Sequence, residues 1–133
     1  VLNGIGLDVS RWPVVIVTPP ASVSNEQLDL FFAAFDREVV SQRRRYSIVL
    51  DLRRCQGMPA GQRKILTDRM QRGEDRARVF CVGSALIFES ALLRSLLTAI
   101  MWVREPPNPV KVFATVDEGA EWASKLLEET KVA

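Results

Sequence analysis

Histidine is absent from this sequence of 133 residues, and cysteine occurs only twice, as Cys55 and Cys81. Without histidine, the chain cannot form a histidine-ligated metal site or a catalytic triad that uses imidazole as its base. The two cysteines match neither a disulfide framework nor the spacing of a zinc site. We therefore expect no metal, no cofactor and no disulfide, and a reducing, cytoplasmic setting.

Patterns for a secretory signal and for a membrane span are also missing. Asn3 and Asp8 interrupt the opening residues, and no small-residue cleavage site follows a long apolar run. Residues 85–103 are the most unusual stretch, with fourteen apolar residues of nineteen, but they include Glu89 and Arg94. A membrane span needs about 20 predominantly apolar residues, so we expect no stable membrane insertion.

The remaining composition is that of one ordinary globular domain covering residues 1–133. Hydrophobic residues make up 47% of the chain and charged residues 26%, which argues against disorder. The charge is unevenly distributed, because residues 41–78 contain eleven Lys or Arg and four Asp or Glu, whereas both ends are acidic. This asymmetry is suited to an anionic partner or to attraction between copies of the chain.

Apolar periodicity and turn residues predict an alternation of strands and helices. Strands are expected at residues 5–9, 14–18, 46–52, 78–82 and 110–114. Helices are expected after a capping box at Ser24 and Gln27, over residues 59–71, within 88–103, and after a second capping box at Thr115 and Glu118. The order β-β-α-β-α-β-α-β-α predicts an α/β fold with a mixed, mostly parallel sheet of about five strands flanked by about four helices.

Three segments carry a resemblance to a known group of proteins. They are IVLDL at residues 48–52, RVFCVG at 78–83 and PVKVFATVDEGAEW at 109–122. With the element order, these segments resemble the STAS-like superfamily, which includes SpoIIAA-type anti-sigma-factor antagonists and the SpoIIAA-like and STAS/SEC14 families. The resemblance implies a single STAS-like domain that acts as a non-enzymatic protein–protein interaction module with a regulatory or scaffolding role.

The sequence departs from that family at the site of its phosphorylation switch. Antagonist-type domains carry a phosphorylatable serine just after the central strand, at the start of the next helix. Here residues 55–62 read CQGMPAGQ, and Ala60 stands nearest that position. Because this stretch has no hydroxyl side chain, we expect no phosphorylation there.

Two residues could support an enzymatic function. Asp51 ends the central strand, where α/β sheets present functional groups, but it has no paired base or acid at readable spacing. A role in capping the following loop or a helix terminus fits it better. Cys55, beside Arg53 and Arg54, could be a nucleophile, but no histidine is available as its base. We therefore expect no enzymatic activity.

A basic set could bind an anionic partner or could be a solvated surface. It comprises Arg43, Arg44, Arg45, Arg53, Arg54, Arg63, Lys64, Arg69, Arg72, Arg76 and Arg78. Only Tyr46 lies nearby in the sequence for base stacking, and no nucleic-acid-binding motif is present, so we expect no nucleic-acid partner. If an anion site exists, we place it at Arg53, Arg54, Arg63 and Lys64, facing an acidic protein surface or a lipid headgroup.

The helix expected within residues 88–103 has apolar residues over more of its circumference than packing on one sheet requires. It is either thoroughly buried, or its surplus face meets a second copy, a protein partner or an acyl-like ligand. The candidate contact residues are Leu93, Leu97, Ile100, Met101 and Trp102. The leading expectation is a protein partner or homodimer, and the alternative is a lipid- or small-apolar-ligand-binding protein of SEC14-like character.

Overall fold

The structure is a computed structural model that describes residues 4–56, 60–62, 64, 65, 68, 80–103 and 108–130. The strands are β1 (Gly6–Asp8), β2 (Val14–Thr18), β3 (Tyr46–Asp51), β4 (Cys81–Ile87) and β5 (Val110–Phe113). The helices are α1 (Asn25–Glu38), the short 3-10 helix η1 (Val40–Gln42), α4 (Ala91–Val103) and α5 (Val116–Thr130). Residues 60–62, 64, 65 and 68 are helical too. They fall within the helix predicted over residues 59–71, whose other residues lie outside the described ranges.

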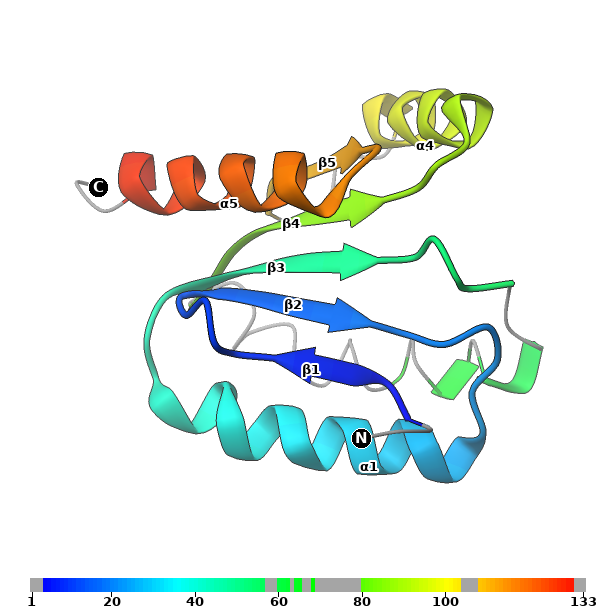
Figure 1. Cartoon of the computed structure of the whole chain (residues 1–133), viewed down its shortest axis with the longest axis vertical. Coiled ribbons are helices and arrows are strands. Elements are labelled where there is room, and N and C mark those ends of the chain that lie inside the picture. Colours follow the sequence, from blue (N-terminus) through cyan, green and yellow to red (C-terminus); the bar gives the residue numbers. More distant parts are fainter. Residues whose placement is uncertain are drawn as a thin grey trace.

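The strands form one sheet in the order β1-β2-β3-β4-β5 (Figure 1). β1 is antiparallel to β2, and every other neighbouring pair is parallel. Parallel neighbours need a crossover connection, which α1 supplies between β2 and β3 and α4 supplies between β4 and β5. The α/β prediction with a mixed, mostly parallel sheet is therefore confirmed.

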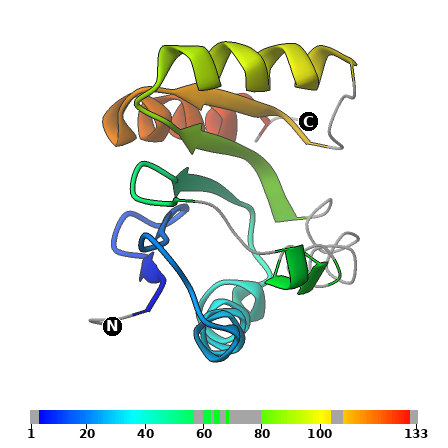
Figure 2. The same ribbon diagram turned by 90° about the vertical axis from the view of Figure 1, so that its right-hand side faces the viewer.

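Two apolar layers cover the two faces of the sheet, and the alternation of side chains along β2 separates them. Val15 and Val17 belong to the layer that contains Leu28 of α1. Val14 and Ile16 belong to the layer that contains the buried alanines of α5, Ala120 and Ala123. Figure 2 shows the same arrangement, with α1 on one side of the sheet and α5 on the other.

The N-terminal caps of α1 and α5 are made by the residues that the sequence predicts. Gln27 N donates to Ser24 Oγ at 3.1 Å, and Ser24 N donates to Gln27 Oε1 at 2.8 Å, so the capping box is complete. At α5, Glu118 N donates to Thr115 Oγ1 at 3.2 Å, and the same hydroxyl donates to Glu118 Oε1 at 3.0 Å. Both caps satisfy backbone groups that a helix start leaves unpaired.

The prediction of a strand over residues 78–82 is wrong at its C-terminal end, because β4 runs from Cys81 to Ile87. Residues 78 and 79 lie outside the described residues. The strand continues through Gly83, beyond the predicted end at Val82. A Cβ at Gly83 would lie 2.8 Å from the carbonyl oxygen of Pro109 and 2.4 Å from Leu126 Cδ2. Glycine is therefore present because another backbone segment and α5 come close to the strand, not because the strand stops there.

This shift also corrects the interpretation of residues 85–103 as one apolar contact segment. Ala85 and Ile87 belong to β4 and are fully buried beneath α5. Only α4, beginning at Ala91, forms the apolar helix, and its contacts with the sheet are made with the edge strand β5. Within the described part of the chain, no helix has the length and apolar character needed to cross a membrane.

Candidate functional site

The acid at the end of the central strand, Asp51, is engaged by its neighbour Arg53. Arg53 Nε donates to Asp51 Oδ1 and Arg53 Nη2 donates to Asp51 Oδ2, both at 2.8 Å, and the backbone N of Arg53 donates to Oδ1 at 3.2 Å. These hydrogen bonds from Arg53 hold the pKa of the Asp51 carboxyl below its ordinary value. The carboxylate thus closes the turn after β3, which confirms the loop-capping role expected from the sequence.

Cys81 does not have the surroundings of an activated nucleophile. Cys81 is buried at the start of β4, and this burial raises the pKa of its thiol, which disfavours the reactive thiolate. Cys55 is half-buried, and its backbone N donates to the carbonyl oxygen of Leu52 at 3.2 Å. Among the described residues, no group of three or more potential metal ligands comes together.

The basic cluster predicted after β3 is only partly described. The guanidinium group of Arg53 forms an ion pair with Asp51. Arg54 and Lys64 are exposed to solvent. Arg63 lies outside the described residues. Ala60, the residue nearest the phosphorylated position of antagonist-type domains, is helical and exposed.

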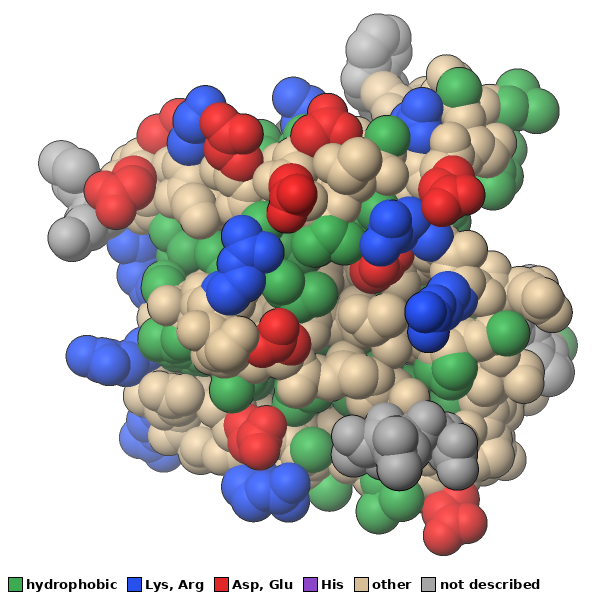
Figure 3. Space-filling view, in the orientation of Figure 1, with side chains coloured by type: hydrophobic (Ala, Val, Ile, Leu, Met, Phe, Trp, Pro, Cys, Tyr) green, Lys and Arg blue, Asp and Glu red, His purple; other side chains and the backbone are tan. Residues whose placement is uncertain are grey.

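α4 presents a row of exposed leucines. Leu92, Leu93 and Leu96 are 79%, 45% and 55% exposed. Leu96 follows Leu92 by four residues and Leu93 by three, so its side chain neighbours both of theirs on the helix surface. Figure 3 shows hydrophobic side chains gathered at the corner where α4 lies in Figure 1. We call Leu92, Leu93 and Leu96 the leucine row. It includes the predicted contact residue Leu93, whereas the side chains of Leu97, Ile100, Met101 and Trp102 lie outside the description.

The one charged residue of α4, Arg94, is directed back to the start of its own helix. Arg94 Nη1 donates to the carbonyl oxygens of Phe88 at 2.6 Å and Glu89 at 2.7 Å. Ser90 Oγ accepts a hydrogen bond from Leu93 N at 3.3 Å in the same turn. The guanidinium group is therefore held at the helix start, and the leucine row carries no charge of its own.

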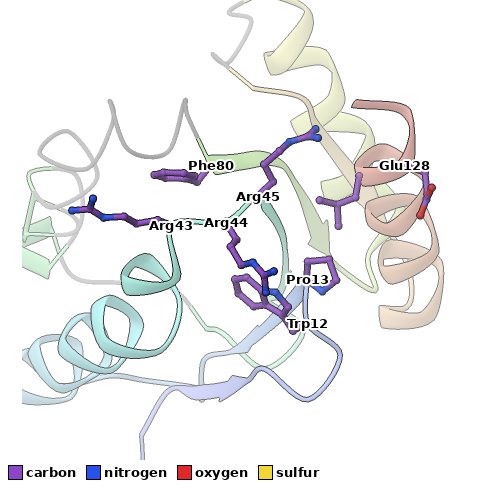
Figure 4. Close-up of a pocket in the computed structure, with 8 residues that line it drawn as sticks. Trp12, Pro13, Arg43, Arg44, Arg45, Phe80 and Glu128 are labelled. Carbon is purple, nitrogen blue, oxygen red and sulfur yellow. The ribbon is translucent and has the colours of Figure 1, made fainter. Parts of the chain in front are cut away.

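A second candidate surface lies at the opposite end of the strands, where β2, β3 and β4 begin. An open hollow of about 550 Å³ is lined by Trp12, Pro13, Arg43, Arg44, Arg45, Phe80, Leu127 and Glu128 (Figure 4). The turn before β2 supplies Trp12 and Pro13, the segment before β3 supplies the arginines, and Phe80 directly precedes β4. We call this site the arginine hollow.

The aromatic residues of the arginine hollow were not predicted from the sequence, because they are distant from the arginines along the chain. Trp12 packs against Tyr46 with ring centroids 6.1 Å apart, which places the indole beside the start of β3. Phe80 packs against the apolar layer on the α1 side of the sheet. One signal in the sequence could have predicted that these residues lie together. Trp12, the arginine run and Phe80 each come just before the start of a predicted or observed strand. Parallel strands begin at the same edge of a sheet, so residues that precede them lie at that edge.

Comparison with known proteins identifies the fold. No protein-family model matches the sequence, and no curated protein matches it. A similar solved structure is that of an uncharacterized protein of the DUF3478 family with a SpoIIAA-like fold from Shewanella loihica PV-4. The two chains are 13% identical, the TM-score is 0.66, and the match covers 90% of this chain and 92% of the other. The chain therefore has a SpoIIAA-like fold, the fold that its resemblance to the STAS-like superfamily predicts.

Proposed function

We propose that this chain is a non-enzymatic interaction module that pairs with a second copy of itself through the leucine row of α4. The observation that carries the proposal is the exposure of Leu92, Leu93 and Leu96, at 79%, 45% and 55%. Large apolar side chains that lie together in contact with water mark interaction surfaces more often than free surfaces. Covering the row would remove this apolar area from water.

The lack of charge within the leucine row is compatible with a second copy as the partner. Arg94 Nη1 is held by the backbone carbonyl oxygens of Phe88 and Glu89 of its own chain, so the contact between two leucine rows includes no charged side chain of the row. A surface of this kind is self-complementary under two-fold symmetry, which is the commonest arrangement of homodimers. The position of α4 beside the edge strand β5 leaves it accessible from outside the domain.

Two features support a function without chemistry of its own. The acid at the end of the central strand is held in a bidentate ion pair with Arg53, and the Cys81 thiol is buried with a raised pKa. The absence of a hydroxyl side chain near Ala60 supports binding that does not depend on phosphorylation at that position.

The test is the mass of the chain in solution, measured by light scattering over a wide range of concentration. A dimer that dissociates on dilution is expected. A monomer at every concentration, up to the highest that remains clear, would overturn self-association through α4.

The alternative is a lipid- or small-apolar-ligand-binding protein. The observation that bears on it is the arginine hollow, whose size is within the range of small-molecule sites. Its three arginines favour a ligand with an anionic group over a wholly apolar one. Native mass spectrometry of the purified chain would show a retained ligand as added mass.

A further inference from the structure

The three arginines of the arginine hollow have positive charge that is not used within the described structure. In the described residues, the guanidinium groups of Arg43, Arg44 and Arg45 form no ion pair and no hydrogen bond. Among the described lining residues, Glu128 is the one acid, and it lies on the α5 side of the hollow (Figure 4). Positive charge is therefore in excess among the described lining residues.

Arg43 has a backbone conformation in which glycine would be more stable. Its φ of 50° and ψ of 43° place it in the left-handed region, at the end of η1. A Cβ atom is unfavourable there, and glycine commonly fills this position at helix ends. The chain nevertheless carries a long cationic side chain at this point. The Arg43 side chain is therefore a candidate for a role in binding, which the variant Arg43→Gly tests.

Flat apolar side chains stand beside these charges. Trp12 is held by its contact with Tyr46, at 6.1 Å between ring centroids, and Phe80 is anchored in the apolar layer on the α1 side. Rings fixed in this way offer faces on which another flat group can stack, at little further cost in side-chain entropy. The volume of about 550 Å³ accommodates a small organic molecule.

We propose that the arginine hollow binds a small phosphate monoester that carries a flat ring. A phosphate monoester bears nearly two negative charges at neutral pH, which suits the excess of positive charge among the described lining residues. Guanidinium groups bind phosphate oxygens through paired hydrogen bonds, and Trp12 and Phe80 stack on the ring. This site is separate from the leucine row, because the hollow lies where the strands begin and α4 follows the end of β4.

The test is isothermal titration calorimetry at low salt with phenyl phosphate, inorganic phosphate and benzoate. Phenyl phosphate is expected to bind, and inorganic phosphate is expected to bind roughly tenfold more weakly because it lacks the stacked ring. Benzoate, with the ring and a single charge, is also expected to bind more weakly. No binding of phenyl phosphate at millimolar concentration would overturn the proposal. Equal affinities for phenyl phosphate and benzoate, or for phenyl phosphate and inorganic phosphate, would do the same.

Variants locate the site. Arg44→Gln and Arg45→Gln are each expected to weaken phenyl phosphate binding roughly tenfold by removing a charged hydrogen-bond donor. Arg54→Gln is the matched control, because Arg54 is exposed after the opposite end of β3, and its affinity should equal that of the wild type. An equal loss of affinity in Arg54→Gln would indicate nonspecific attraction by net charge and would overturn the site.

Arg43→Gly separates a binding role from a structural role. Glycine relieves the left-handed backbone of residue 43, so the melting temperature is expected to stay the same or rise while phenyl phosphate binding weakens. Unchanged binding of phenyl phosphate, whatever the melting temperature, would overturn the part of Arg43 in the site. Leu92→Asp should bind phenyl phosphate like the wild type, whatever it does to self-association.

Discussion

Arg53 holds Asp51 in a bidentate ion pair, with Nε–Oδ1 and Nη2–Oδ2 distances of 2.8 Å. Because this pair lowers the pKa of the Asp51 carboxyl, it stabilises the folded chain above the unfolded pKa of about 3.9. That contribution is lost as the pH falls through the lowered pKa of the folded state. The Arg53 side chain is 36% exposed, so solvent screening limits its contribution.

We therefore predict that Arg53→Gln lowers the free energy of unfolding at neutral pH. The difference from the wild type should shrink as Asp51 becomes protonated in acid. Urea unfolding at neutral pH and at a pH of about 3 measures both values. Arg54→Gln is the comparison, and it should change the acid dependence less, because Arg54 makes the smallest contribution to the lowered pKa of Asp51. An equal loss at both pH values in Arg53→Gln would show that packing of the side chain, not the ion pair, provides the stability.

For the leucine row, we predict that Leu92→Asp and Leu96→Asp each weaken self-association roughly 100-fold, because each places a charge in an apolar contact. Both residues are exposed in the single chain, at 79% and 55%, so the fold should be retained. Leu30→Asp is the matched control, since Leu30 is 64% exposed on α1. Light scattering gives the mass and circular dichroism the fold. If Leu30→Asp disrupted the dimer as strongly, α4 would not be the interface.

Gly83 is expected to tolerate no side chain. Gly83→Ala should lower the free energy of unfolding by about 1–3 kcal/mol, because its Cβ would lie 2.8 Å from the Pro109 carbonyl oxygen and 2.4 Å from Leu126 Cδ2. Gly61→Ala is the control, because nothing lies within 4 Å of its Cβ position. That change in a helical residue should be neutral or stabilising by up to about 1 kcal/mol. Denaturant unfolding measures the stability of both variants. Equal stabilities of Gly83→Ala and Gly61→Ala would contradict the close packing at β4.

Ser47 is completely buried in β3, and its Oγ has no hydrogen-bond partner among the described residues. An unsatisfied buried hydroxyl is unfavourable, since its hydration is lost without compensation. Ser47→Ala is therefore expected to leave the free energy of unfolding unchanged or to raise it by up to about 1 kcal/mol. Thermal and denaturant unfolding measure the change. A loss of more than about 1 kcal/mol would mean that the hydroxyl is satisfied in solution.

Several local features could be predicted from the sequence because they depend on residues close together in the chain. The capping box of Ser24 and Gln27 is one of them, and its hydrogen bonds of 2.8 Å and 3.1 Å span three residues. The alternation of strands and helices is another, because periods of 2 and 3.6 residues are visible in any single segment. The turn after β3 is equally local, since Asp51 and Arg53 are two residues apart.

Other features depend on segments that the chain order does not bring together. The strand predicted up to residue 82 continues through Gly83 to Ile87, where Pro109 and Leu126 come close to the glycine. Trp12 and Phe80 join the arginines before β3 because three strands begin at one edge of the sheet. Periodicity alone left open whether α4 is buried or exposed.

The sequence by itself determined the element order, the helix caps and the lack of histidine chemistry. Composition follows directly from the residues present, and the caps are contacts between residues that are close together in the chain. The tertiary structure alone decided that Leu92, Leu93 and Leu96 are exposed and that an aromatic and cationic hollow forms where the strands begin. Both depend on strand order and helix placement, which arise from packing between distant segments. Which side chains stay exposed to solvent is therefore set by that packing.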